Sequence, residues 1–137
     1  MAVITWIDEY NVGIKVIDEQ HQHLVNILNR MYEVDITNEG NEKRQIRRVF
    51  AELADYMNYH FETEEEILKV ANYPYFQLHK QQHHELAKQL LDLQMNFSKG
   101  DSTVSVELID FLNHWLIDHI LDSDKKYASF LHSKNIF

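Results

Sequence analysis

The chain has no cysteine, only three glycines and a single proline among its 137 residues. Without cysteine it forms no disulfide and offers no thiolate, which excludes zinc fingers, iron–sulfur clusters and cysteine nucleophiles. Any bound metal must therefore be held by nitrogen and oxygen atoms. Glycine and proline are the residues that most often interrupt helices, so their scarcity favours a mostly helical protein.

Long hydrophobic runs and an excess of positive charge are also missing. No apolar stretch is long enough to cross a membrane, and no basic segment followed by an apolar run begins the chain, so we expect no membrane insertion and a cytoplasmic location. Thirteen Lys and Arg residues against 22 Asp and Glu residues leave a formal net charge of −9. This sign is wrong for a surface that neutralises phosphates, so nucleic acid is not an expected partner.

Apolar residues recur at three- and four-residue steps in four runs, which is the pattern of amphipathic helices. We expect Asp18 to cap the first helix and Gly40 to terminate it. The second helix should end before Asn72, and Pro74 should occupy the first turn of the third. These signals are local, so each depends only on a few neighbouring residues.

The third helix should end at Lys99 and Gly100, where a cation and a glycine suit a helix C-terminus. Asp101 or Ser102 should cap the fourth, and Ser123 suggests a break before a short last turn. Short connections make consecutive helices antiparallel. The sequence therefore predicts an all-α protein, an up-down-up-down four-helix bundle.

We expect one domain over residues 1–137, because 45% hydrophobic residues in a chain of this length suffice for a single core. The bundle should occupy residues 18–120, and residues 121–137 should form a C-terminal turn and tail with a short helix. Residues 1–17 lack the helical period and should form an N-terminal arm. The arm should be anchored by its apolar residues: Val3, Ile4, Trp6 and Ile7.

Nine histidines are many for this length. Five of them lie on the apolar faces, and two carboxylates accompany them at metal-ligand spacings: His21, His60, His79, His83, His119, Glu64 and Asp124. A step of four residues turns an α-helix by about 40°, so Glu64 points the same way as His60. His79 and His83 are related in the same way.

A single buried histidine is usually a hydrogen-bonded core residue, but this many polar groups would each cost about 1–3 kcal/mol if unpaired. A metal centre satisfies them together, and imidazoles with carboxylates suit iron, manganese, zinc or copper. Seven ligands are too many for one ion and suit two octahedral ions that share carboxylates. A metal-free bundle is the alternative that a metal count would settle.

The five-residue spacing from His119 to Asp124 does not fit a regular helix, which would turn the carboxylate about 140° away from the imidazole. We therefore expect the helix to bend, widen or end between them. Ser123 is the expected place, because serine competes for backbone hydrogen bonds.

These residues resemble those of a bacterial hemerythrin, in order and spacing, over nearly the whole chain including the arm with Trp6. The resemblance rests on these segments: Ile17–Leu24, His60–Glu65, His79, His83, Trp115–Ile120 and Asp124–Tyr127. It implies two non-heme iron ions with a bridging oxo or hydroxo group. By this resemblance, one iron is held by His79, His83 and His119, the other by His21 and His60, and both by the bridging carboxylates Glu64 and Asp124.

The resemblance also implies an open coordination position on the iron with two histidines, where dioxygen binds. The apolar residues that match the family's dioxygen pocket are Leu24, Phe61, Trp115, Leu116 and Ile120. The expected function is reversible dioxygen binding for oxygen storage, delivery or sensing, and not an enzymatic one. Its expected partners are dioxygen and either an oxygen-consuming enzyme or a reductase.

Two alternatives use the same site differently. A di-iron redox enzyme would act on peroxide or nitrite, or as an oxidase, and would need electrons from a reductase. An oxygen or redox sensor module would pass a change of shape to a partner.

Other polar residues receive simpler interpretations. The candidates that orient the imidazoles are Gln20, Asp118, Tyr127 and carbonyl groups of the arm. The histidines expected at the surface or in packing, and not as ligands, are His23, His84, His114 and His132. In the acidic run from Glu62 to Glu66, only Glu64 is expected to face inward.

Overall fold

The computed structural model describes residues 5–31, 39–100, 107, 110–111 and 114–137. Three long helices come first: α1 (Lys15–Met31), α2 (Glu39–Val70) and α3 (Phe76–Ser98). A π-helix, η2 (Trp115–Asp124), then continues directly into α5 (Lys125–Ser133). Together with the helical residues at 107, 110, 111 and 114, these two elements form what we call the fourth helix. A short 3₁₀ turn, η1 (Asp8–Tyr10), lies in the arm.

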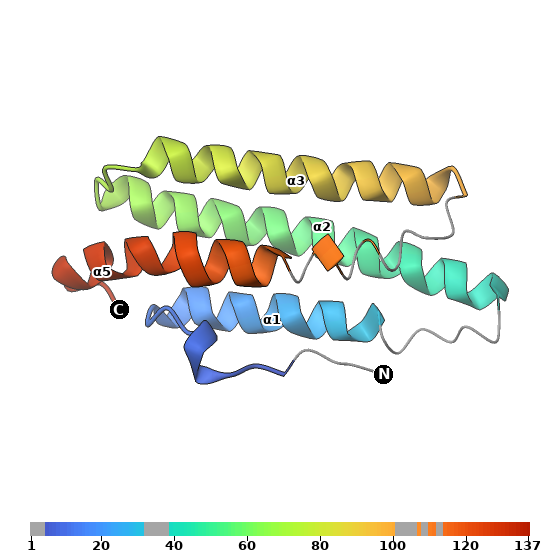
Figure 1. Ribbon diagram of the computed structural model, residues 1–137, viewed down its shortest axis with the longest axis horizontal. Coiled ribbons are helices and arrows are strands. Elements are labelled where there is room, and N and C mark those ends of the chain that lie inside the picture. The colour runs from blue at the N-terminus through green and yellow to red at the C-terminus, as the bar shows by residue number, and fades with distance from the viewer. Residues whose placement is uncertain (1–4, 32–38, 101–106, 108–109, 112–113) are drawn as a thin grey trace.

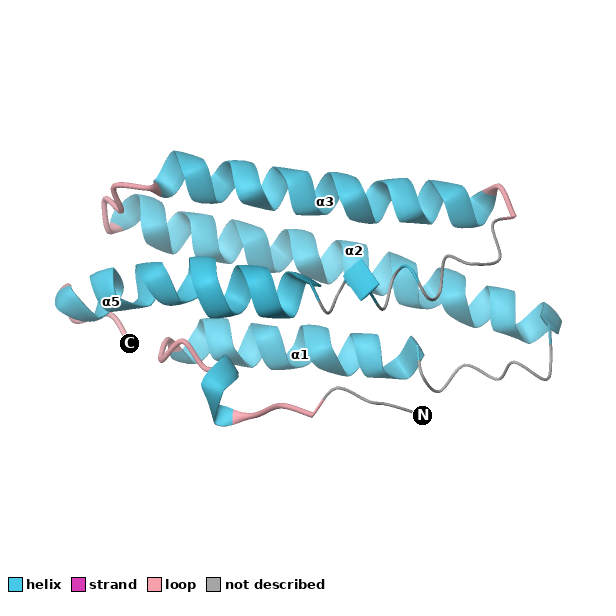
Figure 2. Ribbon diagram, viewed as in Figure 1, coloured by secondary structure: helices cyan, strands magenta, loops and turns pink. Residues whose placement is uncertain are grey.

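Figure 1 shows that successive helices run in opposite directions, with α1 packed on α2 and α2 packed on α3. The predicted antiparallel four-helix bundle is thus confirmed, and Figure 2 shows no strand among the described residues. None of the described helices is both long and apolar enough to span a membrane.

The core consists of the apolar faces that the sequence pattern predicts. On α1, Leu24, Val25 and Leu28 are at most 3% exposed, and α2 contributes Phe50 and other fully buried side chains. Each such side chain stabilises the fold by about 1.5–3 kcal/mol on burial. Between these apolar layers lie the buried polar residues of the described chain: Gln20, His21, His60, Glu64, His79, His83, His119 and Asp124.

The first helix begins earlier than predicted. It starts at Lys15, so Asp18 lies in the first turn and is not the cap. Its carboxylate instead accepts hydrogen bonds from the backbone N–H groups of Val12 (2.7 Å) and Gly13 (3.1 Å), which fastens the arm to the helix. Gly40 does not terminate this helix either, because it falls in the first turn of α2, where glycine is well tolerated.

The arm is anchored by residues closer to α1 than predicted. Ile7 is 42% exposed, whereas Val12 and Ile14 are buried in the core. Val3 and Ile4 lie outside the described residues, and Trp6 packs partly buried against the core. The arm is therefore held where it meets the helix, and residues 15–17, expected in the arm, belong to α1.

The turn signals between α2 and α3, and after α3, correspond closely to the structure. Asn72 has a left-handed backbone (φ 57°) after α2. Because α3 begins at Phe76, Pro74 lies in the turn before this helix and not, as predicted, in its first turn. Gly100, with φ 93°, follows α3 and confirms that end. The expected caps of the fourth helix, Asp101 and Ser102, lie outside the described residues.

Candidate metal centre

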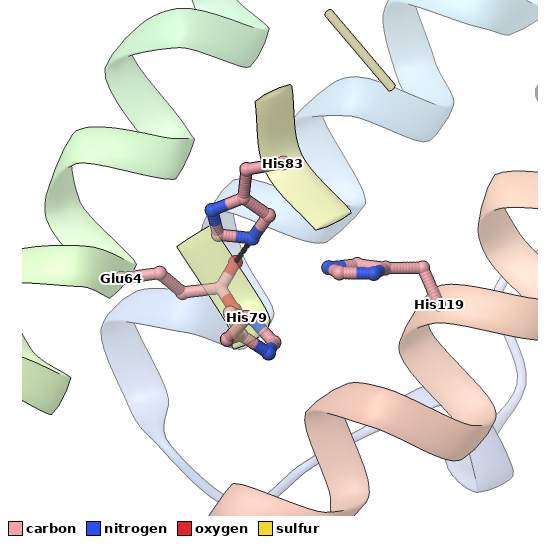
Figure 3. A group of neighbouring side chains, drawn as sticks. All are labelled: Glu64, His79, His83 and His119. Carbon is pink, nitrogen blue, oxygen red and sulfur yellow. Dashed lines mark hydrogen bonds and ion pairs between the residues drawn. The ribbon is translucent and has the colours of Figure 1, made fainter. Parts of the chain in front are cut away.

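Two groups of buried side chains in the middle of the bundle each bring their nitrogen and oxygen atoms within 4.8 Å of one another. The first group contains Glu64, His79, His83 and His119 (Figure 3). The second group contains His21, His60, Glu64 and Asp124. The structure thus brings together all seven residues that the sequence singled out, and Glu64 belongs to both groups.

Each of the four helices of the bundle supplies part of this cluster. α1 contributes His21, and α2 contributes His60 and Glu64, one turn apart with 2.5 Å between Nε2 and Oε2. α3 contributes His79 and His83, whose ring centroids are 4.5 Å apart, again one turn apart. The i, i+4 geometry predicted for these pairs is therefore present.

The fourth helix brings its two residues together by widening. Because η2 is a π-helix, which closes its hydrogen bonds five residues on, residues five apart lie over one another. The distance from His119 Nε2 to Asp124 Oδ1 is 3.1 Å. Of the three predicted alternatives, a bend, a widening or an end of the helix, the structure shows the widening. The break expected at Ser123 does not occur, because α5 follows η2 without interruption.

Glu64 contacts histidines of both groups. Its Oε1 lies 3.0 Å from His79 Nε2. Its Oε2 lies 2.5 Å from His60 Nε2 and 3.7 Å from His83 Nε2, the contact marked in Figure 3. This carboxylate therefore stands between the two sets of imidazoles.

Asp124 occupies a comparable position on the opposite side of the bundle. Its Oδ1 lies 3.1 Å from His119 Nε2 and 3.3 Å from His79 Nε2, whereas its Oδ2 lies 3.2 Å from His21 Nε2. Both carboxylates thus have one oxygen near each group of imidazoles. A carboxylate that joins two metal ions needs this placement.

The site holds its carboxylates ionised. Burial alone would raise the pKa of Asp124, but His119, His21 and His79 outweigh that effect and hold its pKa well below the usual range. The pKa of Glu64 is likewise low, because His60 and His79 offset both its burial and the nearby Asp124.

The histidines divide into two kinds. Burial lowers the pKa of His60 and of His83. Burial also acts to lower the pKa of His79, but the nearby carboxylates of Asp124 and Glu64 raise it to about 10. In the metal-free protein His79 therefore carries a proton at neutral pH, whereas His60 and His83 are neutral and able to bind a metal.

Several buried atoms of the cluster lack a well-formed hydrogen bond. They are Glu64 Oε2, His83 Nε2, His119 Nε2, both carboxylate oxygens of Asp124 and the outer nitrogen of His21, Nδ1. Unpaired buried polar atoms cost about 1–3 kcal/mol each. A pair of metal ions would satisfy all of these atoms except His21 Nδ1, and a set of imidazoles and carboxylates without sulfur suits iron, manganese, zinc or copper.

Two side chains outside the cluster hold imidazoles through their outer nitrogen. His60 Nδ1 lies 2.8 Å from Gln20 Oε1, and the Gln20 amide in turn donates to Thr63 Oγ1 at 3.2 Å. His83 Nδ1 lies 2.9 Å from Glu65 Oε2. The orienting role expected of Gln20 agrees with this contact.

The sequence pattern did not predict the contact of Glu65 with His83. Acidic runs usually face solvent, and nothing in the neighbouring sequence indicates a partner 18 residues away. Asp118, expected to orient a ligand, is instead 73% exposed and lies beside His114. Tyr127 is fully buried, with its ring 5.3 Å from the His79 ring. Burial and the two nearby carboxylates raise its pKa well above the usual value.

Apolar side chains surround the cluster. The Phe61 ring stacks on His83 at 3.9 Å between centroids, and Trp115 meets the His21 ring edge-on at 5.7 Å. Leu24 and Ile120 are buried as well. The side chain of Leu116, the fifth predicted pocket residue, lies outside the described part of the structure.

The other histidines lie away from the cluster. His23 and His84 are exposed, as expected, and His114 is 70% exposed between Asp110 and Asp118. His132, expected in solvent, is half-buried, and its Nε2 donates to the Gly13 carbonyl at 3.0 Å. This bond ties the last helix to the arm.

The chain matches the family described as the hemerythrin HHE cation binding domain over residues 12–131. It belongs to the hemerythrin family. This hemerythrin is 34% identical over 128 residues to the bacteriohemerythrin of Stenotrophomonas maltophilia (strain R551-3), covering 93% of the chain and 81% of that relative. It is 31% identical to the bacteriohemerythrin of Methylococcus capsulatus, with 93% and 96% covered.

The fold agrees with a solved structure of the same family. A crystal structure of wild-type hemerythrin aligns with a TM-score of 0.81 and 29% identity, covering 93% of this chain and 97% of that one. Family and fold together imply non-heme di-iron oxygen binding, for which the buried cluster supplies suitable ligands. The resemblance stated from the sequence is confirmed.

Proposed function

We propose that this hemerythrin binds dioxygen reversibly at a di-iron centre held by the seven clustered residues. One ion would be held by His79, His83 and His119, the other by His21 and His60. Glu64 and Asp124 would join the two. The observation that carries the assignment is that each carboxylate has an oxygen near imidazoles of both groups.

The protein holds the pair of irons and keeps water away. When bound, the iron pair supplies the electrons that dioxygen takes up on binding and that return on release. The ion held by His21 and His60 has the fewer protein ligands and would take the incoming ligand. Apolar side chains would surround that ligand and exclude outside protons: Leu24, Phe61, Trp115, Leu116 and Ile120.

The test is an absorption spectrum of the iron-loaded protein, reduced without air, exposed to oxygen and then flushed with inert gas. We expect about two irons per chain and a visible charge-transfer band that appears with oxygen and disappears on flushing. His60→Ala should abolish the reversible band, and His23→Ala, which removes an exposed histidine, should preserve it. Iron absorption without reversibility, or an unaffected His60→Ala variant, would contradict the proposal.

An oxo or hydroxo group would bridge the two irons. Residues 1–137 would form a single domain, located in the cytoplasm. The protein would act as an oxygen carrier, store or sensor and not as an enzyme. An oxygen-consuming enzyme or a reductase would then be the protein partner. Sustained turnover of peroxide or nitrite with a reductant would instead favour the redox enzyme that uses the same site.

A further inference from the structure

A cleft of about 750 Å³ lies between α3 and the fourth helix and reaches the edge of the buried centre. Its lining includes Trp115 and His119, which are only 2% and 5% exposed. Leu86, Leu93 and Phe111 contribute apolar surface. Among the described residues, the cleft thus connects the surface with His119 of the cluster, and a smaller hollow, which Lys126 also lines, reaches His79.

Carboxylates line both sides of the cleft. The acidic residues of the lining are Glu85 and Asp92 from α3, and Glu107, Asp110, Asp118 and Asp122 from the fourth helix. The described lining contains no lysine or arginine. Of these acids, Asp122 has Lys126 Nζ 3.5 Å from its Oδ1, and Asp110 and Asp118 lie 3.9 Å and 3.4 Å from the imidazole of His114. The lining therefore carries an excess of negative charge.

The inner end of the cleft holds an unpaired polar group. Trp115 Nε1 is buried and has no hydrogen-bond partner, and His119 Nε2 also lacks one. The Trp115 ring meets the His21 ring edge-on at 5.7 Å. Trp115 therefore lines the cleft and also contacts His21, one of the two histidines whose iron would keep an open position.

We propose that this cleft is the route by which small ligands reach the centre, and that its acidic lining selects them by charge. Neutral molecules such as dioxygen and nitric oxide pass freely, whereas anions such as azide and nitrite are held back. The inference rests on the proposed function and specifies which ligands reach the di-iron centre readily.

The physical basis is the focusing of the electrostatic potential by like charges around a low-dielectric opening. At physiological ionic strength the screening length is about 8 Å, so the carboxylates around the opening act together on an ion inside it. The local concentration of an anion falls, and its association slows in proportion. A neutral molecule experiences no such effect.

The kinetic test compares association of azide with the oxidised iron-loaded protein and of dioxygen with the reduced protein, at low and at high ionic strength. We expect salt to speed azide association and to leave dioxygen association unchanged. Asp110→Asn with Asp118→Asn should speed azide by about threefold to tenfold at low salt and flatten its salt dependence. Dioxygen association should not change.

The matched control is Glu62→Gln with Glu66→Gln, which removes the same charge from exposed positions on α2. This control should leave the azide rate within experimental error of the unmodified protein. An equal effect of both double variants would show that only total charge matters and would overturn the selective cleft.

A second readout does not involve ligand binding by iron. In a Trp6→Phe background of the iron-loaded chain, Trp115 is the remaining tryptophan. Its fluorescence should be quenched weakly by iodide and more strongly by neutral acrylamide, and the Asp110→Asn/Asp118→Asn substitutions should increase quenching by iodide alone.

The outcomes separate the two proposals. Reversible dioxygen binding with no response of azide or iodide to the variants would overturn the charge selection and leave the proposed function standing. Loss of reversible dioxygen binding would overturn the proposed function, and iodide quenching would still report whether the lining selects by charge.

Discussion

At the scale of single residues, the two imidazoles held by outer side chains differ in the charge of their partner. His60 faces the neutral amide of Gln20, whereas His83 faces the carboxylate of Glu65. A carboxylate that accepts the outer N–H makes an imidazole a stronger donor to its metal and stabilises the higher oxidation state. The iron assigned to His83 should therefore be the more easily oxidised of the pair.

The variant Glu65→Gln tests this difference, because it can keep the hydrogen bond and removes the charge. We expect a higher reduction potential and roughly tenfold weaker metal binding. A spectroelectrochemical titration and a chelator competition would measure the two effects. Glu66→Gln, an exposed neighbour on the same helix, is the control, and equal shifts in both variants would refute the role of Glu65.

Phe61 provides a second test at this scale, because its ring stacks directly on His83. Phe61→Ala should cost about 3–5 kcal/mol of stability and admit water beside the centre, so the oxygenated protein should decay faster. Phe50→Ala removes an equally buried ring that packs near Phe97. It should destabilise the fold by a similar amount without faster decay, measured by chemical unfolding and by the lifetime of the oxygenated absorption band.

At the scale of elements, local signals predict some helix ends well and others poorly. Asn72 and Gly100 take positive φ angles where the sequence indicates stops, because a turn signal of this kind depends on the residue itself. Gly40 gives the same signal and is wrong, since glycine is also tolerated in the first turn of a helix, here α2. The choice between the two depends on where α1 packs.

The cluster itself could be predicted because helical spacing fixes which side chains share a face. The need for a distortion also followed from the five residues between His119 and Asp124, although its form as a π-helix did not. Glu65 could not be found, because its contact with His83 joins α2 to α3 and depends on how the two helices are rotated. Tertiary contacts of this kind leave no periodic signal in a single chain.

Where the arm meets the last helix, the steric cost of a side chain at Gly13 can be separated from the cost of its left-handed backbone. Gly13 has φ +84°, and a Cβ there would meet His132 Cε1 at 2.8 Å, so Gly13→Ala should cost about 1–3 kcal/mol of unfolding free energy. Gly100→Ala, with φ +93° and no atom within 4 Å, should show the backbone cost alone.

The double variant Gly13→Ala/His132→Ala separates the two contributions. Removing the His132 ring should recover the steric part of the loss, apart from the hydrogen bond that His132 gives to the Gly13 carbonyl. Urea unfolding of the unmodified protein, of Gly13→Ala, of His132→Ala and of the double variant would measure the differences. Losses that simply add would show that the ring and the Cβ do not interact.

At the scale of the whole molecule, one proton on His79 stabilises the metal-free fold and competes with metal binding. In the metal-free protein His79 is protonated between Glu64 and Asp124. The protonated imidazole pairs two buried carboxylates and stabilises the empty bundle. A metal ion must displace that proton, because the same nitrogen is its ligand.

The stability of the metal-free protein and its affinity for metal should therefore change in opposite directions with pH. The pKa of His79 rises from 6.5 to about 10 on folding, so the stability it contributes is fully present below 6.5 and is lost as the pH rises through about 10. Metal affinity should instead increase by up to about tenfold per pH unit between neutral pH and the His79 pKa. The ionised carboxylates and the neutral His60 and His83 do not titrate in this window.

Thermal unfolding of the metal-free chain and Zn²⁺ competition against a chelator, both between about pH 7 and 9, would measure the two trends. Zn²⁺ accepts the same imidazole and carboxylate ligands and is not oxidised at high pH. His79→Gln should flatten both curves, whereas His84→Ala, which removes an exposed histidine of the same helix, should preserve them. Parallel trends in the unmodified protein would mean that the site holds no such proton.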